Sequence, residues 1–405
     1  MKELKRVRYL EMIRPFYNDG GMIKVLIGLR RCGKSTIMKQ ISEEIREQTP
    51  DANIIYLDLD EDVYRNVSTP DQLDAEIKKN IASGSNFLFI DEVQNVDGFE
   101  KVVESYRKKN ISTFLTGSNS YLLSGELTTK LTGRYFEFRI LPFSFSEVEE
   151  YRRTNNIDVD PQKDFNDYLI YGGLPKRFDY PDASSQQKYV FSVIEETKKK
   201  DILKRSKVRD MALLDRMIAF VASIPSQEIS SNSIKKYIAK EGIRTKQTTV
   251  SNYLDKIFSS NIASKCLRYD VVGKKALKTL YKSYLSDLAI HTFISGKKDR
   301  LDFGMLIENI VYNELISRGY TVLVGKKGKY EIDFVISDGL KKAYMQVAYL
   351  IPEQEVLDRE ERPLLSLKDN YPKYIVSMDP ITMSDNGIIR LNLIDDFLLG
   401  DRFSL

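Results

Sequence analysis

The amino-acid sequence predicts an α/β protein that begins with a doubly wound parallel sheet. Short apolar runs alternate with amphipathic helical stretches through residues 1–142, which is the order that parallel strands with helical crossovers require. A glycine-bearing loop follows the first apolar run, and a pair of carboxylates ends the third. Because ligands bind beyond the carboxyl ends of parallel strands, we expect both features at one edge of the sheet.

Five apolar runs are the predicted strands of this sheet: 22–27, 53–59, 86–91, 113–116 and 135–140. The predicted helices between them lie near 35–48, 70–80, 99–109 and 121–131. We therefore expect residues 1–142 to form one domain. At 405 residues the chain is long enough for further domains.

A phosphate-binding motif, GxxxxGK[ST], lies between the first predicted strand and the first predicted helix. It reads Gly28-Leu29-Arg30-Arg31-Cys32-Gly33-Lys34-Ser35-Thr36. In this context, successive backbone amides and the helix N-terminus can point at one polyphosphate. We expect Lys34 to reach the β- and γ-phosphates and the Ser35 hydroxyl to bind Mg²⁺. The loop is thus a predicted nucleotide site.

The third apolar run ends in the carboxylate pair Asp91-Glu92. Adjacent residues at a strand end point in different directions, so Asp91 can hold Mg²⁺ beside Ser35 while Glu92 polarises a water molecule. The alternative is two acids that only cap a strand. No NKxD-type guanine motif follows the fourth strand, which favours ATP as the nucleotide.

Small polar residues follow the fourth predicted strand at the same edge of the sheet. Ser118 and Asn119 are candidate sensors of the γ-phosphate that orient the attacking water. Both residue types are equally suited to cap a helix N-terminus, and this alternative stays open.

The composition limits the classes of function. The chain is 42% apolar and 30% charged, with two cysteines and one histidine, which provide neither a disulfide framework nor a zinc cluster. We expect a cytoplasmic protein without a membrane partner, because no apolar run has the length of a membrane span or the pattern of a signal peptide. Carboxylates, lysine, arginine and metal ions must supply any catalysis.

Basic residues are concentrated in one part of the chain. Residues 231–283 hold twelve Lys or Arg against three acids, although the net charge of the whole protein is only +4. This asymmetry predicts one basic module in an otherwise acidic chain, and together with the winged-helix order described below it favours DNA as the partner of residues 231–283.

These motifs together resemble a prokaryotic AAA+ ATPase family with a restriction-nuclease-like C-terminal domain. The resemblance rests on the Walker A loop, the strand that ends in Asp91-Glu92, and the segments 116–119 and 131–134. It implies that Arg134 is an arginine finger that reaches the ATP of a neighbouring subunit in a homo-oligomer. The alternative is a cation that the dipole favours at a helix C-terminus.

Residues 143–210 have the pattern of a helical lid and connector. Gly172-Gly173-Leu174-Pro175 resembles the glycine-x-proline element by which signalling-type NTPases touch the adenine or sense the nucleotide state. Pro175 is therefore a predicted nucleotide contact, with an ordinary interhelical turn as the alternative.

Residues 211–300 show the order of a winged helix-turn-helix. Helices are predicted at 213–223, 233–239 and 247–259, and strands at 262–268 and 277–281. The third helix would enter the major groove, and a protein-docking module is the alternative. A positive face is expected on the wing from six residues, Lys265, Arg268, Lys274, Lys275, Lys278 and Lys282.

Residues 301–405 show an αβββαβ order that resembles the PD-(D/E)xK nuclease core. Glu308 and Asp333 match the helical and strand acids of that core, with Glu331 close by. Gln346 and Ala348, however, stand where a carboxylate and a lysine activate water. A nuclease-derived binding or scaffold domain is therefore favoured over an active nuclease.

The predicted function is Mg²⁺-dependent ATP hydrolysis that controls the arrangement of domains or subunits and, through it, DNA binding. Two alternatives stay open. One is a slow nucleotide-loaded switch that binds a protein partner. The other is an ATP-controlled nuclease at Glu308 and Asp333.

Overall fold

The computed structural model describes residues 2–117, 131–203, 208, 210–295, 302–380 and 384–405, with the backbone alone at 276 and 278–280. The chain divides into two compact units. The first holds residues 5–141 and 259–261, and the second holds the rest. Each unit is described by itself. None of the helices in the described ranges combines the length and the apolar character that a membrane span needs.

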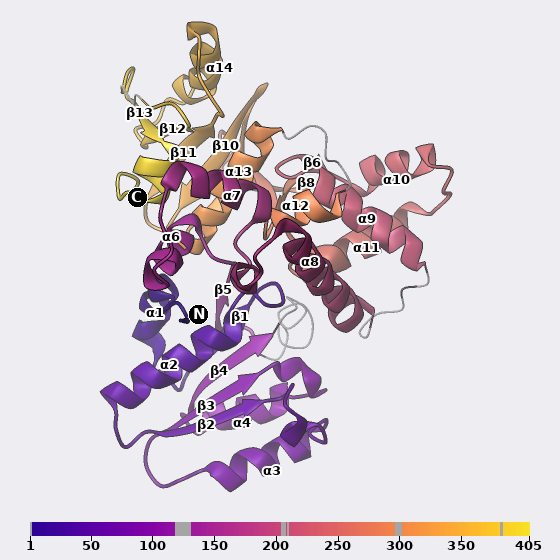
Figure 1. Ribbon diagram of the computed structural model, residues 1–405, viewed down its shortest axis with the longest axis vertical. Coiled ribbons are helices and arrows are strands. Elements are labelled where there is room, and N and C mark those ends of the chain that lie inside the picture. The colour runs from indigo at the N-terminus through magenta and orange to yellow at the C-terminus, as the bar shows by residue number, and fades with distance from the viewer. Residues whose placement is uncertain (1, 118–130, 204–207, 209, 296–301, 381–383) are drawn as a thin grey trace. The chain divides into compact units, whose positions relative to one another are not determined.

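The first unit contains a five-stranded sheet in which every neighbouring pair is parallel. In spatial order, its strands are β2 (Asn53–Asp58), β3 (Asn86–Asp91), β4 (Ser112–Gly117), β1 (Ile23–Ile27) and β5 (Tyr135–Arg139). Helices α1 (Val7–Ile13), α2 (Lys34–Gln48), α3 (Pro70–Asn80) and α4 (Glu100–Lys108) accompany it (Figure 1). The five predicted strands and the parallel sheet are confirmed, with strand ends that differ by a residue or two.

The physical causes of these elements are local. All five residues of β1 are buried, as expected for a central strand covered on both faces. Thr69 and Gln72 form a reciprocal capping box at the start of α3, and Pro70 occupies its first turn, where no backbone donor is needed. The helix is therefore fixed by its first four residues.

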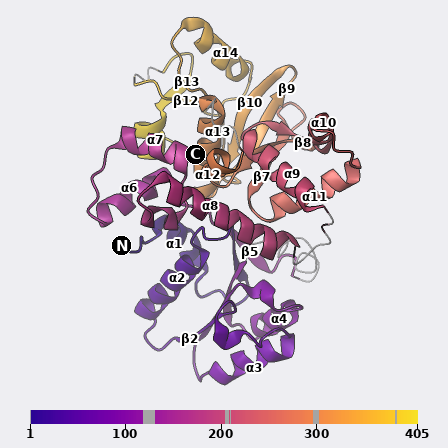
Figure 2. The ribbon, with the colours of Figure 1, turned by 45° about the vertical axis from the view of Figure 1, so that its right-hand side comes forward.

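The second unit begins with helices and continues into a larger sheet (Figures 1 and 2). Its first helices are α6 (Phe145–Thr154), α7 (Pro161–Tyr171), α8 (Ala183–Thr197), α9 (Met211–Ser223), α10 (Ser231–Lys240) and α11 (Gln247–Ser259). Helices α12 (Ala289–Ile294), α13 (Phe303–Ser317) and α14 (Gln354–Leu365) follow later in the chain.

The sheet of this unit is mixed and has eight strands. In spatial order they are β13 (Ile388–Asn392), β12 (Lys373–Ser377), β11 (Lys342–Val347), β10 (Tyr330–Ser337), β9 (Thr321–Lys327), β7 (Ala263–Asp270), β8 (Lys275–Leu285) and β6 (Glu228–Ile229). The predicted wing is the antiparallel pair β7 and β8, and β7 also pairs in parallel with β9. The wing hairpin and the C-terminal strands therefore share one sheet.

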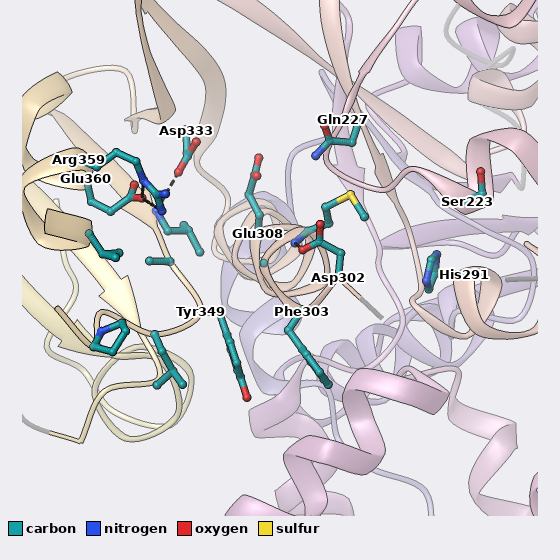
Figure 3. Close-up of a pocket in the computed structure, with 17 residues that line it drawn as sticks. Ser223, Gln227, His291, Asp302, Phe303, Glu308, Asp333, Tyr349, Arg359 and Glu360 are labelled. Atoms are coloured by element: carbon teal, nitrogen blue, oxygen red, sulfur yellow. Dashed lines mark hydrogen bonds and ion pairs between the residues drawn. The ribbon is translucent and has the colours of Figure 1, made fainter. Parts of the chain in front are cut away.

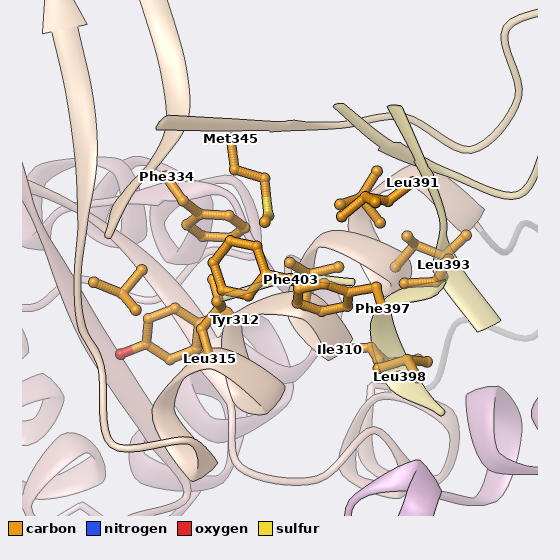
Figure 4. Close-up of a cluster of buried hydrophobic side chains, with 14 of the residues drawn as sticks. Ile310, Tyr312, Leu315, Phe334, Met345, Leu391, Leu393, Phe397, Leu398 and Phe403 are labelled. Carbon is orange, nitrogen blue, oxygen red and sulfur yellow. The ribbon is translucent and has the colours of Figure 1, made fainter. Parts of the chain in front are cut away.

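The core of the second unit packs α13 against this sheet. Its buried members include Tyr312, Phe334, Met345 and Phe397 (Figure 4). The Tyr284 and Tyr312 rings stack with centroids 4.0 Å apart. This packing brings β8, α13 and β10 together, and these three elements carry the acidic and basic side chains described below.

Candidate nucleotide-binding site

The loop of residues 28–33 connects β1 to α2 and depends on its two glycines. Gly33 adopts a left-handed conformation with φ of 101° immediately before α2. A Cβ atom at Gly28 would lie 2.1 Å from the carbonyl oxygen of Ile140. Because a side chain fits neither position without strain, the shape of the loop itself requires these glycines.

Lys34 is buried at the start of α2. Its Nζ donates hydrogen bonds to the carbonyl oxygens of Gly28 and Leu29, both at 3.2 Å. The ammonium thus lies against the loop that would hold a polyphosphate. Ser35 and Thr36 are partly buried in the same helical turn.

Two buried residues, Cys32 and Arg6, hold the loop in place through hydrogen bonds to backbone carbonyls. Cys32 donates from Sγ to the carbonyl oxygen of Ile140 at 3.3 Å, and burial raises the pKa of its thiol, so its role is packing. The Arg6 guanidinium donates from Nη1 to the carbonyl oxygens of Cys32 and Leu141, both at 3.1 Å. Arg6 lies outside every recognisable motif, which is why its role was not predicted.

Asp91 ends β3 as a buried carboxylate. Its Oδ1 accepts a hydrogen bond from the Thr116 hydroxyl, and its Oδ2 accepts one from the Tyr56 hydroxyl at 3.4 Å. The backbone amide of Glu92 donates to Thr116 Oγ1 at 2.9 Å. Thr116 on β4 therefore connects the predicted metal ligand Asp91 with the predicted base Glu92, a role that was not predicted from the sequence.

Glu92 follows in a left-handed conformation with φ of 52°. Its Oε2 forms an ion pair with Arg30 Nη2 at 3.6 Å and accepts a hydrogen bond from the Gln94 amide. Burial raises the pKa of the Glu92 carboxyl, while the charges of Lys34 and Arg30 oppose the shift. The predicted base is thus within electrostatic reach of two cations of the loop.

The donor set at this edge of the sheet fits a magnesium nucleotide. Asp91 and Ser35 offer the hard oxygen ligands that Mg²⁺ prefers, and Lys34 together with the N-terminus of α2 supplies positive charge for phosphates. The structure brings together the loop, Asp91 and Glu92 as predicted. Their individual roles stay predictions.

Four other predicted site residues are not placed at this site by the described residues. Ser118 and Asn119 fall outside the described residues. Arg134 immediately precedes β5 and forms an ion pair with Glu104 at 2.8 Å, with 47% of its side chain exposed. Pro175 begins a short 3₁₀ helix in the second unit, where Gly173 N donates to the carboxylate of Asp287 at 2.8 Å.

A second polar cluster occupies the larger sheet of the second unit. Glu308 and Asp333 line a cavity of about 1550 Å³, together with Arg359 and Glu360 (Figure 3). Asp333 Oδ2 accepts a hydrogen bond from the amide of Val347 at 2.9 Å. The predicted pair of acids therefore does converge.

Lys282 from β8 lies among these acids. Its Nζ is 2.9 Å from Glu308 Oε1, 3.1 Å from Glu331 Oε1 and 3.8 Å from Asp333 Oδ1. Gln346 Oε1 accepts from the Asp333 amide at 2.7 Å. Within the described ranges, no three His, Cys, Asp or Glu side chains are arranged so that they could hold a metal ion.

The positive face expected on the wing is smaller than predicted, because three of its six basic residues form ion pairs with acids. Lys282 is buried in this cluster, Arg268 pairs with Glu228 and Glu331, and Lys265 pairs with Asp255. A sequence pattern shows charge but not its partners, so these pairings were not predictable.

Comparisons with known proteins first define the class. Residues 21–149 match a family model described as an AAA domain, and residues 162–301 match a domain of unknown function (DUF8612). The first unit thus contains an AAA-family ATPase domain, in agreement with its parallel sheet and phosphate loop.

The chain is 32% identical over 403 residues to an uncharacterized protein of Haemophilus influenzae, and the match covers 98% of both chains. The protein therefore belongs to the same family as that H. influenzae protein. An uncharacterized protein of Methanocaldococcus jannaschii is 26% identical, over 92% of this chain and 85% of its own.

Solved structures give more distant matches. The Aeropyrum pernix ORC1 protein in complex with DNA is 12% identical with a TM-score of 0.32, over 73% of this chain and 93% of its own. AMPPCP-bound DnaA from Aquifex aeolicus is 14% identical with a TM-score of 0.31, over 64% of this chain and 88% of its own.

Proposed function

We propose that the first unit binds ATP with Mg²⁺ and transfers the γ-phosphoryl group to water, and that this reaction controls DNA binding by the protein. The AAA-domain match supports ATP as the substrate. One observation carries the proposal. The carboxylates of Asp91 and Glu92 lie at the end of β3, and Arg30 of the phosphate loop lies 3.6 Å from the Glu92 carboxylate.

Each residue of the site has a defined role in this reaction. Lys34 exchanges the carbonyls of its loop for oxygens of the β- and γ-phosphates. Ser35 and Asp91 hold Mg²⁺, which when bound neutralises phosphate charge. Glu92 orients a water molecule and accepts its proton while the water oxygen bonds to the γ-phosphorus and the bond to the bridging oxygen breaks. ADP and phosphate are released.

Four further residues complete the proposal. Ser118 or Asn119 senses the γ-phosphate, Pro175 contacts the nucleotide, and Arg134 acts in a neighbouring subunit of a homo-oligomer. The Arg134 side chain is exposed, as an arginine finger must be. On assembly it would exchange its ion pair with Glu104 for the phosphates of the neighbouring subunit's ATP.

DNA is the proposed partner of residues 231–283. Basic side chains on and beside α10 and α11 are exposed, and the supporting positions are Lys235, Lys236, Lys240, Arg244 and Lys246. Gln247 and Thr248 are exposed at the start of α11, where the recognition helix of a winged helix meets base edges. The proposed DNA surface is therefore that of α10 and α11, because the basic residues Lys265, Arg268 and Lys282 of the hairpin β7–β8 are paired with acids.

For the nuclease-like part of the chain we propose a binding or scaffold role. Lys282 offsets part of the charge of Glu308, Glu331 and Asp333 through direct ion pairs. A cluster of this kind, in which Arg268 is a second cation on Glu331, stabilises the packing of β8 on α13 and β10. Plasmid cleaved by the wild type with Mg²⁺ or Mn²⁺, but not by Glu308→Gln, would contradict this role.

Phosphate release from ATP tests the ATPase proposal. Lys34→Ala should abolish both ATP binding and turnover, because the charge that meets the phosphates is lost. Lys39→Ala removes an exposed lysine of the same helix and should behave as wild type. Turnover by Lys34→Ala equal to that of the wild type would contradict the proposal.

Binding to duplex DNA at several salt concentrations tests the partner. Lys246→Ala should make the negative slope of log affinity against log salt shallower by about 0.9, the value for one lost phosphate contact. The matched control is Lys163→Ala, an exposed lysine of α7. Absence of duplex binding, with turnover unaltered by DNA, would favour the nucleotide-loaded switch instead.

A further inference from the structure

A small pocket lined by tyrosine and lysine lies beside β7 and β11 of the larger sheet and shares no lining residue with the cavity of Glu308 and Asp333. Its volume is about 480 Å³, within the roughly 300–1,000 Å³ range of small-ligand pockets. Eight residues line it: Tyr269, Val271, Lys274, Lys342, Tyr344, Asp369, Asn370 and Tyr371. They come from β7 and the turn after it, from β11, and from the segment before β12.

Two aromatic side chains of this pocket, Tyr344 and Tyr371, differ in how far they are buried. Tyr344 is buried, and its ring meets that of Tyr371 edge to face with centroids 6.1 Å apart. The Tyr344 hydroxyl donates to Asp369 Oδ2 at 2.7 Å, which fixes the ring. Tyr371 remains 43% exposed. One aromatic face is thus held by the core while another is accessible.

Lys342 lies between two of the tyrosine rings. Its Nζ is 4.9 Å from the Tyr269 centroid, 5.4 Å from the Tyr371 centroid and 3.3 Å from the Tyr269 hydroxyl. Among the described residues, neither Lys342 nor Lys274 forms an ion pair with an acid. The two ammonium groups therefore keep their charge, and Asp369, whose Oδ2 accepts from Tyr344, is the acid that shares the pocket lining.

The lysines continue beyond the pocket onto neighbouring strands. Lys275 is exposed at the start of β8, and Lys326 on β9 pairs in register with Asp270 of β7. The Asp270 carboxylate is occupied by the amides of Val272 and Gly273. Lys275 therefore adds a cation next to Lys274, whereas Lys326 shares the face of Asp270, which is opposite to that of Tyr269.

We propose that this pocket binds one nucleotide of a single-stranded nucleic acid, with the base stacked on Tyr371 and the adjacent phosphates on Lys342 and Lys274. Accessible aromatic faces beside a basic track are what single strands require, because every base has a face that can stack. A duplex keeps its bases stacked on each other and cannot use the pocket. The inference rests on the proposal that nucleic acid is a partner, and it is independent of ATP hydrolysis.

Fluorescence anisotropy with a labelled 12-nucleotide DNA strand, without ATP, tests this inference. The wild type should bind the strand, and Tyr371→Ala should weaken binding about tenfold, the order expected for one lost stacking contact. Tyr371→Phe keeps the ring and should bind as the wild type does. Lys342→Gln should lower the salt slope by about 0.7, as for one phosphate on a single strand, whereas Lys163→Ala should not change it.

A strand of equal length without bases separates stacking from charge. It should bind no better than Tyr371→Ala binds the complete strand. Equal affinity of the wild type for the abasic and complete strands, or of Tyr371→Ala and wild type for the complete strand, would overturn the inference. Binding of the duplex but not of the single strand would also overturn it while leaving DNA in place as the proposed partner.

Discussion

The guanidinium of Arg30 lies 3.6 Å from the carboxylate of Glu92, so the phosphate loop and the proposed water-activating base contact each other directly. Gln94 donates to the same carboxylate oxygen. Two neighbours therefore orient Glu92, one from the loop and one from the turn that follows β3.

The contact between Arg30 and Glu92 predicts how the pH dependence of hydrolysis responds to mutation. Glu92 must be deprotonated to act as a base, and burial already raises its pKa while Arg30 lowers it. Arg30→Gln should raise the pKa of Glu92 further and move the acidic limb of kcat/KM to higher pH. The exposed Arg46 of α2 provides the control, Arg46→Gln. An unmoved acidic limb in Arg30→Gln would show that Arg30 does not act on the base.

Thr116 predicts a second effect on turnover. Its hydroxyl bonds to Asp91 and accepts from the Glu92 amide, so Thr116→Val removes the connection without changing the shape of the side chain. We expect kcat to fall about 10- to 100-fold, as for other residues that orient metal ligands, with ATP still bound. Thr113→Val changes a buried threonine of the same strand whose hydroxyl bonds only to a backbone carbonyl, and kcat should be kept. Equal losses in both variants would indicate a packing effect instead.

Lys282 is expected to stabilise the second unit. Removing it in Lys282→Ala leaves the partly buried acids Glu308 and Asp333 without the buried cation that they share. The loss of one partner from a buried ion pair costs about 3–5 kcal/mol. Urea denaturation followed by circular dichroism measures the change, and Lys163→Ala should stay near the wild type. A change below about 0.5 kcal/mol, the size of ordinary surface effects, would contradict a stabilising cluster.

Asp333 predicts the pH dependence of that stability. Burial, followed by the charge of Glu308, raises its pKa to about 8, above the value of about 3.9 in an unfolded chain. An acid whose pKa is raised on folding contributes most stability below pH 4 and loses this contribution as the pH rises toward 8. Asp333→Asn should therefore flatten the pH profile of the unfolding free energy over this range. If the pH profile of the unfolding free energy is the same in Asp333→Asn and the wild type, other groups cause the pH dependence of stability.

The sequence predicted the features that depend on local pattern. The five strands of the first unit are continuous apolar runs, and the loop from Gly28 to Ser35 is a contiguous motif. Asp91 and Glu92 were located because the end of a buried strand places them at the ligand edge. In each case the relevant residues are neighbours along the chain.

The features that were missed join residues distant in sequence. Thr116 begins the segment 116–119, to which only Ser118 and Asn119 were assigned roles, and its bond to Asp91 exists only because β3 and β4 are neighbours. Lys282 looked like one charge of a basic wing, whereas the pairing of β7 with β9 brings its hairpin into the sheet that carries Asp333. The pattern of one sequence does not show which strands are neighbours or which of their residues lie side by side.

The most direct test of the central claim is single-turnover hydrolysis of ATP by Glu92→Gln. We expect this variant to bind ATP as tightly as the wild type but to release phosphate at least about 100-fold more slowly, because the group that accepts the proton from water is gone. Glu43→Gln, which changes an exposed acid of α2, should retain full turnover. Wild-type hydrolysis by Glu92→Gln would contradict the account.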